Sequence, residues 1–163
     1  MEDIQDIEIA LYGVQGLYGG RNIWITKDSN ITVQKVDVSG TRNEGLVEEL
    51  YQWQLSKEQL NELSNSIKKA DIKNLKIPKR LGVPDEAYNL LYVRDAQGNT
   101  STHFKWDDDL CFGFDLVYDL LIHIASDAQN HQAYSTGKYN NACPDIANNF
   151  PSFDELMFLA DDG

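Results

Sequence analysis

The stretch EAYNLLYVRDAQGNTSTHFKWDDDLCFGFDLVYDLLIHIA, residues 86–125, decides the fold. Its first part contains two strand-like segments, 86–95 and 99–107, which flank a short turn that includes Gly98. Because glycine adopts a positive φ without strain, these segments predict an antiparallel hairpin. The second part predicts a long helix, since apolar residues recur every four positions. They are Phe112, Leu116, Leu120 and Ile124, with Val117 and Leu121 widening the stripe.

The chain before this stretch predicts three further strands and one helix. Apolar residues alternate with others in the segments 7–11, 22–28 and 31–38, a period that is typical of strands. Ser56 and Gln59 fit a capping box, in which a hydroxyl and an amide satisfy backbone groups at the start of a helix. The buried face of that helix would carry Leu60, Leu63 and Ile67.

The predicted order of elements is β-β-β-α-β-β-α, which defines an α+β fold. Since hairpins join the strands, we expect a mainly antiparallel sheet of about five strands with two helices packed on one face. Residues 1–128 would form this single α+β domain. Residues 129–163 would be a polar tail with a short amphipathic helix, and Ser152 and Glu155 would cap that helix.

Composition and charge limit the classes of partner. The 163 residues include 26 Asp and Glu against 14 Lys and Arg, which gives a formal net charge of −12. Such a surface repels nucleic acid and anionic membranes, so we expect neither as a partner. It favours a protein partner with a basic face, although acidity also serves simply to keep a protein in solution.

The N-terminus and the cysteines indicate the cellular location. The first residues, MEDIQDIEIAL, lack the features of a secretory signal, and no stretch has the length of a membrane span. Cys111 and Cys143 do not form a C-x-x-C pair and are too few for a disulfide framework. We therefore expect a cytoplasmic protein of bacterial type with reduced thiols, and leave open a single bridge between these two cysteines.

Asp107, Asp108 and Asp109 are the most conspicuous candidates for chemistry. Calcium loops place carboxylates at alternate positions and include a glycine, and this run does neither. At the start of a helix, Asp108 or Asp109 would instead cap free N–H groups at the positive end of the dipole. We therefore predict residues that start a helix, with no metal and no cofactor.

The remaining reactive side chains do not form a known catalytic pattern. Twelve residues of helix would separate Cys111 from His123 by about 18 Å, which is too far for a nucleophile and its base. We therefore expect no catalytic residues and no enzyme activity. The alternative is a small metal-dependent or acid–base enzyme that uses the aspartate cluster with Asp85, Glu86 and His103.

Large apolar side chains in exposed settings would contact a partner. The glycine-rich segment 13–20 lacks the spacing of a phosphate loop and presents two large apolar residues at its tip. A tryptophan lies three residues before the first helix cap, and tryptophan is frequent at the centre of interfaces. The C-terminal helix adds an apolar face. The expected partner-binding residues are Leu17, Tyr18, Trp53, Phe153, Leu156 and Phe158.

The order of short motifs over residues 5–124 matches the layout of a known family. The matching residues are Gly19-Gly20, Leu55 with the helix of Leu60 and Leu63, Ala70-Asp71, Asp85, Tyr88, and Asp95 with Gly98. In this layout the chain resembles emfourin-type bacterial inhibitors of thermolysin-like metalloproteases. The resemblance implies a small α+β protein that acts by binding another protein. The chain departs from the family in its connection 39–55 and after residue 128, and we carry over no inhibitory residue.

Three functions follow as hypotheses. The first is a non-catalytic acidic binding protein, an inhibitor or immunity-like module, that engages a protein partner. The second is the small enzyme described above. The third is a structural or assembly subunit that docks through its C-terminal helix, on another protein or on a second copy in a homo-oligomer.

Overall fold

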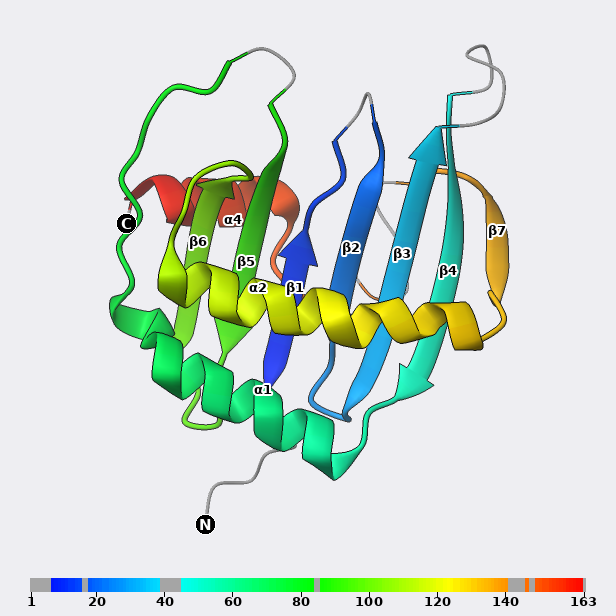
Figure 1. The fold of residues 1–163 in the computed structure, drawn as a ribbon, viewed down its shortest axis with the longest axis horizontal. Helices are drawn as coiled ribbons and strands as arrows, with labels where there is room; N and C mark the ends of the chain where they lie inside the picture. The colour runs from blue at the N-terminus through cyan, green and yellow to red at the C-terminus, as the bar shows by residue number, and fades with distance from the viewer. Residues whose placement is uncertain are drawn as a thin grey trace.

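The computed structural model describes residues 7–15, 18–38, 45–83, 86–140, 146 and 149–162. These residues form one seven-stranded sheet with helices on both of its faces (Figure 1). The strands are β1 (Glu8–Tyr12), β2 (Gly20–Ile25), β3 (Asn30–Val38), β4 (Leu46–Gln54), β5 (Tyr88–Arg94), β6 (Thr100–Trp106) and β7 (Ser135–Lys138). The helices are α1 (Lys57–Ala70), α2 (Phe112–Ala125) and α4 (Phe153–Asp162), with short 3-10 helices η3 (Ile72–Asn74) and η4 (Ser126–Asn130).

The sheet is antiparallel throughout, in the order β6-β5-β1-β2-β3-β4-β7. The α+β class is therefore confirmed. The prediction of about five strands is wrong, because the described residues form seven. The two additional strands are β4, in the connection 39–55, and β7, in the predicted polar tail.

Both additional strands lie near one edge of the sheet, where little apolar surface is buried. The sequence of β4, LVEELYQWQ, mixes apolar with charged and polar residues, and Glu48 is its one buried residue. The sequence of β7, STGK, contains no large apolar residue, and all four residues are exposed. Backbone pairing with β4 over residues 135–138 holds β7 in place. Hydrophobic periodicity cannot reveal strands that depend on the backbone ladder.

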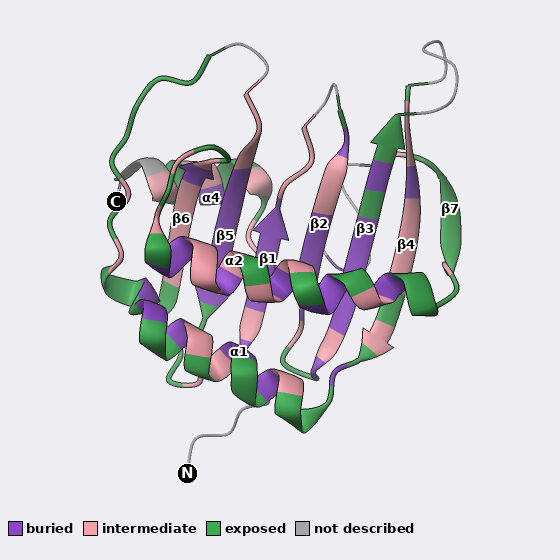
Figure 2. Ribbon diagram, in the orientation of Figure 1, coloured by how far each residue is buried: buried purple, intermediate pink, exposed green. Residues whose placement is uncertain are grey.

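The helices α1 and α2 cover one face of the sheet, and the larger apolar core lies between them and the strands (Figure 2). The predicted capping box at the start of α1 is confirmed by hydrogen bonds between Ser56 and Gln59 in both directions. The predicted stripe on α2 is partly wrong, because Phe112 is exposed. Its fully buried large residues follow the 3.6-residue period more closely than steps of four. They are Phe114, Val117 and Leu121, followed by Ile124.

The third helix, α4, packs on the opposite face of the sheet, so the prediction that only two helices pack on the sheet is wrong. Figure 1 shows it behind β5 and β6. The predicted cap is present, since the backbone N–H of Glu155 donates to Oγ of Ser152 at 3.1 Å. Leu156 is fully buried there in a second core. The buried residues of this core are Ala10, Tyr12, Trp24, Leu90, Tyr92, Ile146, Phe150 and Leu156.

Candidate functional site

The three consecutive aspartates lie in the turn that joins β6 to α2, and their side chains have separate roles. Asp107 accepts a hydrogen bond from the amide of Asn89 at 3.1 Å, and Asp108 is exposed. Asp109 accepts two hydrogen bonds from the guanidinium of Arg80, each at 2.9 Å. The three carboxylates therefore do not converge on a shared point.

The start of α2 corrects the prediction that Asp108 or Asp109 caps this helix. The N-cap residue is Cys111, and its side chain makes no capping hydrogen bond. Asp115, in the first turn, instead accepts a hydrogen bond from the backbone N–H of Cys111 at 3.1 Å. Cys111 is a free cysteine, whereas Cys143 lies outside the described residues.

A buried lysine organises the same turn. Lys105 lies in β6, and only 4% of it is exposed. Its ammonium forms an ion pair with Asp115 at 3.2 Å and donates to the backbone carbonyls of Trp106 and Asp107 at 3.2 Å. It also donates to the carbonyl of Asp109. One buried cation thus connects the end of β6, the aspartate turn and the first turn of α2.

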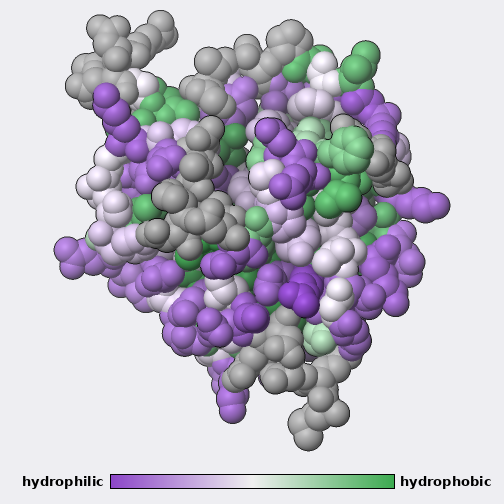
Figure 3. Space-filling model, turned by 180° about the vertical axis from the view of Figure 1, so that it is seen from behind, coloured by the Kyte–Doolittle hydropathy of each residue, from purple (hydrophilic) through white to green (hydrophobic). Residues whose placement is uncertain are grey.

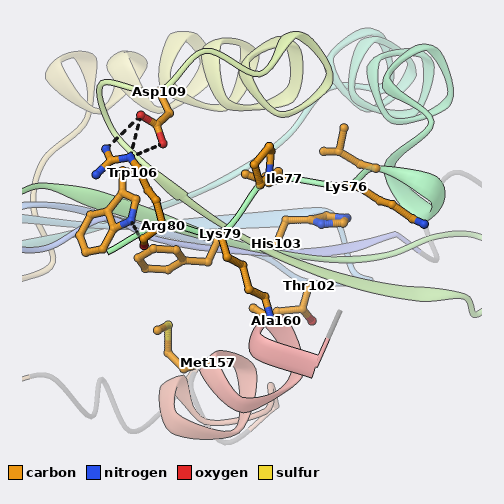
Figure 4. Close-up of a pocket in the computed structure, with 13 residues that line it drawn as sticks. Lys76, Ile77, Lys79, Arg80, Thr102, His103, Trp106, Asp109, Met157 and Ala160 are labelled. Carbon is orange, nitrogen blue, oxygen red and sulfur yellow. Dashed lines mark hydrogen bonds and ion pairs between the residues drawn. The ribbon is translucent and has the colours of Figure 1, made fainter. Parts of the chain in front are cut away.

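Arg80 ties the loop before β5 to this turn (Figure 4). Its guanidinium forms ion pairs with Glu86 and Asp109 and lies 5.5 Å from the ring centroid of Trp106. The indole N–H of Trp106 donates to the carbonyl of Arg80 at 3.2 Å. The hydrogen bonds that Arg80 donates to Glu86 lower the pKa of Glu86, and the bonds that it donates to Glu86 and Asp109 raise its own pKa. The loop 75–83 is therefore attached to the end of β6.

Large exposed apolar side chains follow the members of this ion-pair network closely in the sequence. Leu81 follows Arg80 directly and is 95% exposed, and Leu110 follows Asp109 directly and is 96% exposed. Phe112, two residues later, is 71% exposed. We call Leu81, Leu110 and Phe112 the corner patch. Scattered exposed leucines are common, but three such residues around one ion pair mark a candidate contact surface.

A pocket of about 300 Å³ lies beside the corner patch, between the loop 75–80, β6 and α4 (Figure 4). His103 forms part of its wall, with Nε2 at 2.7 Å from the carbonyl oxygen of Ile72. Burial lowers the pKa of His103, so the neutral imidazole is favoured. The pocket is lined by Leu75, Lys76, Ile77, Pro78, Lys79, Arg80, Thr102, His103, Phe104, Trp106, Asp109, Met157 and Ala160.

The residues predicted to bind a partner are dispersed over the molecule. Tyr18 is exposed beside β2, and Leu17 lies outside the described residues. Trp53 is partly buried in β4, where its ring stacks on His131 with centroids 4.5 Å apart. Its indole nitrogen is buried, with no hydrogen-bond partner within the described part of the chain.

Three predicted contact residues belong to α4, and they differ in exposure. Leu156 is fully buried, and Phe153 packs against the rings of Tyr12 and Tyr88. Both side chains therefore help to attach the helix to the sheet. Phe158 is exposed, and Figure 3 shows small hydrophobic groups among mainly hydrophilic side chains on the face of the molecule that carries α4.

The sequence interpretation did not include the corner patch. The four-residue spacing to Leu116 predicts Phe112 on the buried stripe of the helix. Leu81 and Leu110 are single leucines in otherwise polar turns, KRLGVP and DDDLC. The feature of the sequence that could indicate these exposed leucines is a leucine within a turn that also contains charged residues.

The described residues of the alternative enzyme hypothesis do not form a recognisable centre. Within the described ranges, no group of three His, Cys, Asp or Glu side chains is arranged to hold a metal ion. Glu86 is bound to Arg80, and His103 is bound to a backbone carbonyl. Asp85 lies outside the described residues.

No helix in the described part of the chain combines the length and apolar character needed to cross a membrane.

Comparison with known proteins gives no family for this chain. No protein-family model matches the sequence, and no curated protein matches it either. The function is therefore inferred from the geometry of the corner formed by β6, the loop 75–83 and the start of α2.

Proposed function

We propose that this protein is a non-catalytic binding module that engages a protein partner through the corner patch. The observation that carries the proposal is the exposure of Leu81, Leu110 and Phe112, which lie close in sequence to Arg80 and Asp109 of a multiply bonded ion-pair network. Exposed leucine and phenylalanine side chains gain most from burial against another protein. A preorganised surface also loses little conformational entropy on binding.

The charge around the corner patch supports a partner with a basic face. Residues 107–125 contain five aspartates and no lysine or arginine. Asp107, Asp108 and Asp119 are exposed, so they supply an acidic rim beside the apolar centre. An apolar centre with a charged rim is the usual anatomy of a protein interface, and acidic rims steer basic partners. We place this inhibitor-like or immunity-like protein in the cytoplasm, where Cys111 stays reduced.

The assembly hypothesis makes a different surface essential. It uses the exposed face of α4, where Phe158 and Leu159 are the exposed large apolar residues. Two leucines can therefore distinguish the hypotheses, Leu110 in the corner patch and Leu159 on α4. Both are single exposed leucines, and a substitution at either leaves the buried core unchanged.

The proposal predicts position-dependent cross-linking in the native host cell. We expect a photoreactive benzoylphenylalanine at position 110 to form one discrete adduct with a second protein. The same group at Tyr18 or Leu159 should form little or none. Because the rim is acidic, raising the ionic strength of a fresh lysate from about 0.05 to 0.5 M should weaken the adduct. Electrophoresis of the cross-linked products measures these yields.

A second substitution provides the control. Leu81→Asp in the chain with the photoreactive residue at position 110 should abolish the adduct, whereas Val38→Asp should leave it unchanged. Equal adducts at positions 110 and 159 would contradict the proposal. An adduct between two copies of this chain would also contradict it and would favour a homo-oligomer.

A further inference from the structure

The exposed side chain of Leu81 depends on its backbone for its position. It is 95% exposed, so it packs against almost nothing within the chain itself. The carbonyl of Arg80, directly before it, accepts a hydrogen bond from the indole N–H of Trp106 at 3.2 Å (Figure 4). The carbonyl of Leu81 accepts a hydrogen bond from Nη1 of Arg80, also at 3.2 Å. These two bonds hold the peptide groups on both sides of the Leu81 Cα atom.

The next residue, Gly82, lies directly against the ring of Trp106. A Cβ atom at position 82 would lie 2.8 Å from Cζ3 of the indole and closer still to Cζ2 and Cη2. Carbon atoms attract one another most strongly at about 3.5–4.0 Å, so these separations are strongly repulsive. Every residue other than glycine has a Cβ atom. The loop can therefore rest on this ring only because position 82 has no side chain.

The indole of Trp106 is held from several sides. The rings of Phe104 and Tyr88 make edge-to-face contacts with it, at centroid separations of 4.9 Å and 6.5 Å. The guanidinium of Arg80 lies 5.5 Å from its centroid. Such contacts oppose movement of the ring, since each depends on its orientation. A side chain at position 82 would therefore displace the loop rather than the indole.

We propose that Trp106 is a positioning residue for the corner patch, and that Gly82 is the loop residue that makes this possible. The indole N–H holds the backbone before Leu81, and the face of the ring supports the backbone after it. The inference rests on the proposed function, because it explains how Leu81 is presented to the partner. Trp106 acts through Leu81 and needs no contact of its own with the partner.

The geometry is tested first on the full-length chain without a partner. The indole N–H signal of Trp106 is the one that disappears from the ¹⁵N–¹H NMR spectrum of Trp106→Leu. We expect Gly82→Ala to shift this signal and to speed its exchange with water, because the bond to the Arg80 carbonyl breaks. Lys79→Ala, a change at an exposed residue of the same loop, should leave the signal in place. An unchanged signal in Gly82→Ala would overturn the inference whether or not a partner is found.

The effect on binding is measured by calorimetry with the purified partner that cross-links to position 110. Gly82→Ala and Trp106→Leu should each raise the dissociation constant on the order of tenfold, since a displaced leucine is no longer buried by the partner. The two changes together should raise it no further than Trp106→Leu alone, because both release the same contact. Losses that multiply in the double variant would overturn the inference.

A background without the leucine separates positioning from a general structural role. Leu81→Ala alone should weaken binding, and the addition of Gly82→Ala should then have no further effect, because no leucine remains to be misplaced. A further loss in this background would overturn the inference and leave the proposed function standing. Unchanged binding by Leu81→Ala alone would contradict the proposed function itself, and the inference with it.

Discussion

Lys105→Met is expected to destabilise the protein by about 3 kcal/mol. The substitution keeps the apolar stem but removes the ammonium that pairs with Asp115 and binds three backbone carbonyls. The three carbonyl oxygens lose the hydrogen bonds that the ammonium donates. Because the side chain at position 105 shields them from water, no solvent molecule replaces those bonds. Because part of the Asp115 side chain reaches water, the cost should lie at the lower end of the range for broken buried ion pairs. Urea denaturation at neutral pH measures the difference.

Two comparisons make the effect of Lys105 interpretable. Lys69→Met removes an exposed lysine of α1 and should change the free energy of unfolding by less than about 0.5 kcal/mol. In a double-mutant cycle, Lys105→Met with Asp115→Asn should cost less than the sum of the single substitutions. Equal denaturation midpoints for the Lys105 and Lys69 variants would show that the buried cation does not organise the turn.

Leu156→Ala is expected to destabilise the protein by about 2–5 kcal/mol. Leu156 is fully buried between α4 and the sheet, in the core that contains Trp24 and Leu90. Truncation removes apolar contacts and leaves a cavity, and both effects favour unfolding. Thermal melting followed by circular dichroism measures the loss.

Leu159 provides a matched control in the same helix. It is 51% exposed, so Leu159→Ala should change stability by only about 0.5 kcal/mol. Helix propensity is affected almost equally by the two substitutions, since both replace leucine with alanine. Similar small effects at both positions would mean that α4 is not packed on the sheet.

The sequence predicts those parts of the fold that local patterns specify. The capping residues Ser56 and Gln59 mark the start of α1, and the turn at Gly98 marks the β5–β6 hairpin. Both depend on hydrogen bonds or backbone angles within a few residues. The strand β7 lacks such a signal, because its pairing partner is about ninety residues earlier in the chain.

The candidate site was harder to predict than the fold. The spacing of the aspartate run differs from that of calcium loops, but the neighbours of these aspartates depend on tertiary contacts. Lys105 is a lysine on a polar strand, and nothing local indicates that its ammonium is buried among carbonyls. Equally, the exposure of Phe112 depends on how α2 is rotated against the sheet. Hydrophobic periodicity predicts how wide the apolar face of a helix is. It predicts less accurately which residues lie at the edges of that face.

The packing of the site supports its proposed role as a rigid surface. Lys105 fixes the turn that carries Leu110, and Arg80 fixes the loop that carries Leu81. The leucines are therefore exposed on backbone that is held by buried or multiply bonded cations. Rigid apolar groups of this kind are suited to be the residues that dominate binding energy.

The partner that cross-links to position 110 can be purified in its free form and mixed with variants of this chain. Calorimetry of these mixtures tests the central claim most directly. Leu81→Ser with Leu110→Ser should weaken binding on the order of 100-fold, the effect of removing residues at the centre of an interface. Val38→Ser with Leu159→Ser removes comparable exposed apolar side chains elsewhere and should leave the dissociation constant unchanged. Unchanged binding by the first variant, or an equal loss with the second, would contradict the assignment of the corner patch as the binding surface.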